Sequence, residues 1–91
     1  MEKNRDEKIY DYADEFINLA NKMAETDKSG DVGVALRFAA ARYCAYEASL
    51  RTGNLAEDRE EQVQDFVKVF TEMLRINIED YIKIQTQEKG I

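Results

Sequence analysis

The sequence contains no histidine, no proline and no tryptophan, and it has a single cysteine. Without histidine, the chain lacks the commonest general base and the commonest transition-metal ligand in proteins. One cysteine cannot form a disulfide within the chain, so nothing in the sequence indicates an oxidising compartment. These absences predict a protein that is not an enzyme and that holds no metal and no cofactor. We expect Cys44 to be a small packed residue rather than a nucleophile.

Acidic residues outnumber basic ones: the chain has 19 Asp and Glu and 13 Lys and Arg, which gives a net charge of −6. Nucleic-acid binders and proteins attracted to anionic membranes both need a basic surface, which this composition does not favour. No apolar run approaches the roughly 20 residues of a transmembrane helix, and the N-terminal segment is charged where a signal peptide is apolar. We therefore expect a cytoplasmic protein that binds neither nucleic acid directly nor a membrane.

The residues that are present favour long helices. The chain has 91 residues, 44% of them hydrophobic and 35% charged, and only four glycines. This composition indicates one folded domain over residues 1–91, with an ordered core of about 6–86. Apolar spacing predicts helices over about 6–26, 32–51, 55–76 and 78–86. Short connections favour antiparallel neighbours, so we expect a small all-α antiparallel bundle of three main helices with a short fourth helix after Asn77.

The third predicted helix has the clearest apolar spacing in the chain. Asn54 followed by Glu57 resembles a capping box and marks its start. Asn77 followed by acidic residues reads as a second N-cap, which predicts the break before the short fourth helix. If the helix instead continues, its exposed apolar end favours dimerisation. The apolar face comprises Val63, Phe66, Val67, Phe70, Met73, Leu74, Asn77, Tyr81 and Ile84.

The central stretch, residues 34–50, carries a bulky stripe and an alanine-rich stripe, which indicates a helix with two packing faces. Arg42 falls between the two stripes, so two alternatives stay open. Its stem covers apolar surface while its head reaches water, or it is buried and held by a partner, since an unpaired buried charge costs several kcal/mol. In the second case Arg42, Tyr43 and Tyr46 are candidates for a buried polar or ligand position.

Three segments of the sequence together resemble an uncharacterised, mainly proteobacterial family of small helical proteins with a domain of unknown function. The segments are residues 12–21, then residues 32–35 with 39–46, and finally residues 70–74 with 77–82. Cys44 departs from the pattern, because asparagine is common there in the family. The resemblance implies a small helical bacterial cytoplasmic protein and implies no activity.

These observations favour one function and leave two alternatives. The first is a small non-enzymatic interaction or assembly module that binds a protein partner or itself, for example as a homodimer. The second is an acidic inhibitor or nucleic-acid mimic that occupies a basic site on a partner. The third is a small-ligand binder or enzyme with a pocket at Arg42.

Overall fold

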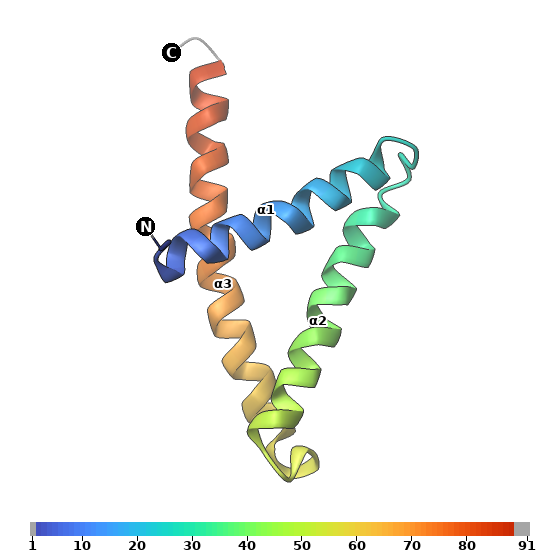
Figure 1. The fold of residues 1–91 in the computed structure, drawn as a ribbon, viewed down its shortest axis with the longest axis vertical. Helices are drawn as coiled ribbons and strands as arrows, with labels where there is room; N and C mark the ends of the chain where they lie inside the picture. The colour runs from blue at the N-terminus through green and yellow to red at the C-terminus, as the bar shows by residue number, and fades with distance from the viewer. Residues whose placement is uncertain (1, 89–91) are drawn as a thin grey trace. The chain divides into compact units, whose positions relative to one another are not determined.

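The computed structural model describes residues 2–88 of the chain, and within them it contains three α-helices and no strand (Figure 1). The helices are α1 (Arg5–Ala24), α2 (Asp31–Arg51) and α3 (Leu55–Glu88). The predicted all-α class with three main helices is therefore confirmed. The predicted ranges of the first two helices differ from α1 and α2 by at most two residues at either end.

The internal contacts divide the chain into two compact units, and the division falls inside α2. The first unit extends to Tyr43 and contains α1, the connecting turn and the first part of α2. The second begins at Cys44 and contains the end of α2, a short turn and α3. The expectation of a single domain stays a prediction.

Asparagine side chains cap two of the helices. In the first unit, the Oδ1 atom of Asn4 accepts a hydrogen bond of 2.9 Å from the backbone N–H of Glu7. In the second, Oδ1 of Asn54 accepts one of 3.3 Å from the N–H of Glu57. Each bond satisfies one of the backbone donors that a helix start leaves free. The predicted capping role of Asn54 is thus confirmed.

The turn between α1 and α2 is built from side-chain hydrogen bonds. Oδ1 of Asp27 accepts from both the backbone N–H and the hydroxyl of Ser29, at 2.9 and 2.6 Å. The Ser29 hydroxyl oxygen in turn accepts from the N–H of Asp31, the first residue of α2, at 3.1 Å. Gly30, between Ser29 and Asp31, has a φ of +97°, a backbone conformation that residues with a Cβ atom rarely adopt. These contacts set where α2 begins.

The predicted break at Asn77 is wrong, because α3 continues without interruption from Leu55 to Glu88. Its 34 residues correspond to about 51 Å, whereas the 20 residues of α1 and the 21 of α2 reach only about 30 Å each. Asn77 does not cap a new helix, since its Nδ2 donates to the carbonyl of Met73 at 2.8 Å. An asparagine inside a helix can donate such a hydrogen bond to a backbone carbonyl of the preceding turn.

Candidate functional site

One face of α3 carries apolar residues at a regular spacing of four and three positions. We call it the α3 stripe and define it by seven residues: Val63, Val67, Phe70, Leu74, Asn77, Tyr81 and Ile84. A repeat of seven residues with two inward positions has a period of 3.5, which matches the period of helices that wind around each other in a left-handed coiled coil. The pattern therefore suits pairing with another helix over its whole length.

The side chains of the α3 stripe are open to solvent. The six apolar members have exposed fractions between 44% and 67%, and Asn77 is exposed as well. Single exposed apolar residues are ordinary in proteins, but a contiguous apolar surface marks an interaction site. Six large apolar side chains lie in one line along α3.

The end of α2 packs on α3 beside the stripe. Ala48 is buried, at 4% exposure, and the guanidinium carbon of Arg51 lies 4.5 Å from the centre of the Phe66 ring. On α3, Gln62 and Phe66 are half-buried. At 100° per residue, the middle of the α3 stripe lies about 90° around the helix from Gln62 and about 50° from Phe66. The end of α2 therefore contacts α3 at the edge of the stripe, and Val63 and Val67 stay 45% and 50% exposed.

The three residues predicted as a candidate polar position all lie on α2, and all three are exposed. Within residues 2–88, Arg42 makes no salt bridge. The salt bridge in this range joins Lys3 and Asp11. An exposed head group is what the first of the two alternatives for Arg42 requires. Tyr43 and Tyr46 both have interactions of their own and are 63% and 56% exposed.

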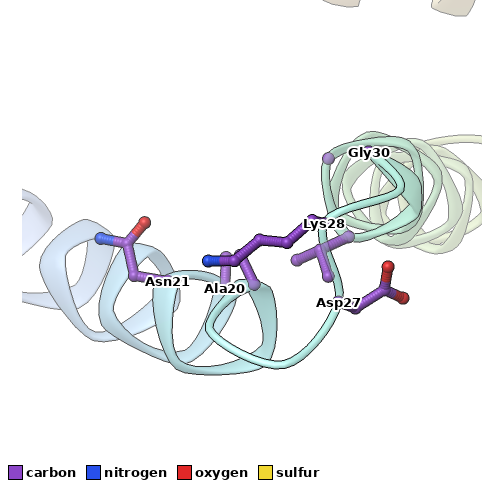
Figure 2. A pocket seen from close by; sticks show the side chains of 8 residues that line it. Ala20, Asn21, Asp27, Lys28 and Gly30 are labelled. Carbon is purple, nitrogen blue, oxygen red and sulfur yellow. The ribbon is translucent and has the colours of Figure 1, made fainter.

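The first unit contains an open pocket of about 370 Å³ at the junction of α1, the connecting turn and α2 (Figure 2). Its apolar lining comes from Ala20, Ala24 and Val32, while Asn21, Asp27 and Lys28 add polar groups. Hydrogen bonds from Ser29 lower the pKa of the Asp27 carboxyl below its ordinary value of 3.8. Since these bonds fix the turn, the carboxylate has a structural role here. The pocket includes none of the predicted candidate residues.

No group of three or more Asp, Glu or Cys side chains is placed to hold a metal ion between residues 2 and 88. No helix within the same range is long and apolar enough to cross a membrane.

Sequence reasoning missed the contacts that join α2 to α3. The Thr52 hydroxyl donates to the Asp58 carboxylate, and its oxygen accepts from the N–H of Asn54 at 3.1 Å. Arg51 and Phe66 were each placed on a helix, but not opposite each other. The short turn 52–54 could have indicated these contacts, because it brings the last turn of α2 close to the first turns of α3.

Three helices and an open apolar stripe define a small all-α protein. The chain belongs to the family described as protein of unknown function (DUF3144), whose model matches residues 9–82. The expected membership in a domain-of-unknown-function family is thereby confirmed. Comparison with curated proteins and with solved structures gave no match.

Proposed function

We propose that this protein is a non-enzymatic interaction module that associates with a second copy of itself through the α3 stripe. One observation carries the proposal: six large apolar side chains lie in line along α3 at coiled-coil spacing, each at least 44% exposed. Covering such a surface is favourable by roughly 25 cal/mol for each Å² of apolar area removed from water. A second copy supplies an equal stripe of the same length and spacing.

The α3 stripe, from Val63 to Ile84, is about 32 Å long, close to the roughly 30 Å of α1 and of α2. An α3 from a second copy matches it residue for residue. Antiparallel packing of successive helices within one chain, which the short turns favour, stays a prediction, as does bacterial, cytoplasmic residence.

Light scattering after size-exclusion chromatography tests the proposal across a dilution series. We expect a molar mass above the 10.5 kDa of one chain at high concentration, falling toward that value on dilution. A mass of one chain at every concentration would contradict self-association. If the protein instead captures a basic partner, and added salt weakens that capture, the acidic-inhibitor alternative gains support.

A further inference from the structure

We draw no further inference here: the strongest candidate, the open pocket at the junction of α1, the connecting turn and α2, carries none, because the side chains of Asn21, Asp27 and Lys28 at it are all exposed and nothing in the part of the chain that the structure describes shows what would occupy it.

Discussion

The guanidinium of Arg51, in the last turn of α2, lies over the ring of Phe66 in α3, with 4.5 Å between its central carbon and the ring centre. A cation over an aromatic face at this distance is attracted by the negative face of the ring. Because Arg51 is exposed and Phe66 half-buried, the contact is worth about 0.5–1 kcal/mol. It links two helices across the short turn 52–54, beside the buried Ala48.

The first prediction concerns this contact. Arg51→Ala should lower the free energy of unfolding by about 0.5–1 kcal/mol, and in a Phe66→Leu background the same substitution should cost less. Urea unfolding of the four proteins, at one protein concentration, gives the coupling between the two side chains. Additive losses would show that the ring and the cation do not interact. Arg42→Ala is the matched control: an exposed Arg42 predicts a loss below about 1 kcal/mol, whereas a buried ion pair would cost about 3–5 kcal/mol.

A second prediction compares the same chemical change at two asparagines of α3. Asn54→Ala removes the side chain that caps the helix and should cost about 1 kcal/mol of stability. Asn77→Ala lies in the helix interior, where alanine has the higher helix propensity, so it should change stability by less than about 0.5 kcal/mol. Thermal or urea unfolding measures both. A loss near 1 kcal/mol at Asn77 would be the mark of a cap and would argue for a break there.

A third prediction compares two glycines near the start of α2. Gly30 has a φ of +97°, so Gly30→Ala should destabilise the protein by about 1 kcal/mol or more, although its Cβ would meet open space. At Gly33 an added Cβ would meet only the Arg37 Nη1 atom, at an ordinary 3.5 Å. Gly33→Ala should therefore stabilise α2 by about 0.5–1 kcal/mol. Equal effects at the two positions would contradict the turn geometry.

A fourth prediction concerns the pH dependence of the turn between α1 and α2. The side-chain and backbone hydrogen bonds from Ser29 lower the pKa of Asp27 from its ordinary 3.8. A carboxyl whose pKa is lower when folded stabilises the protein above its unfolded pKa, and this contribution disappears as pH falls through the folded pKa. NMR titration of the Asp27 carboxyl should give a pKa below 3.8, and Ser29→Ala should move it back toward that value. An unchanged pKa in Ser29→Ala would show that the hydroxyl is not the cause.

Local signals in the sequence predicted the helix starts well and the continuity of α3 poorly. Asn54 and Asn77 are each followed by acidic residues, and the two sites look alike in sequence. Thr52 and Gly53 end the preceding helix before Asn54, whereas no glycine or proline lies between Leu55 and Glu88. A break at Asn77 would sacrifice backbone hydrogen bonds that a continuous helix keeps, and the apolar spacing continues from Leu74 to Tyr81 and Ile84 without a shift in register.

The candidate position at Arg42 shows a different limit of sequence reasoning. Angles around a helix gave its place between two apolar stripes of α2, but they do not determine how much of the side chain a neighbour covers. The contact of Arg51 with Phe66 likewise depends on how a three-residue turn orients two helices. Side-chain coverage and contacts between helices depend on packing, and the periodicity of one helix does not determine them.

Sedimentation equilibrium of two charge variants measures whether the α3 stripe joins two copies of the chain. Leu74 is a member of the stripe, whereas Ile76, two residues further along α3, points away from it and is even more exposed, at 66% against 48%. Both become glutamate in the test, so charge, helix and local propensity are matched.

We expect Leu74→Glu to weaken association by about tenfold or more, because each pair of copies buries two charges in place of two leucines. Ile76→Glu should associate as the native chain does, and both variants should keep their helicity. If Leu74→Glu associates as strongly as the native protein, or if both substitutions weaken association equally, the α3 stripe is not the contact surface.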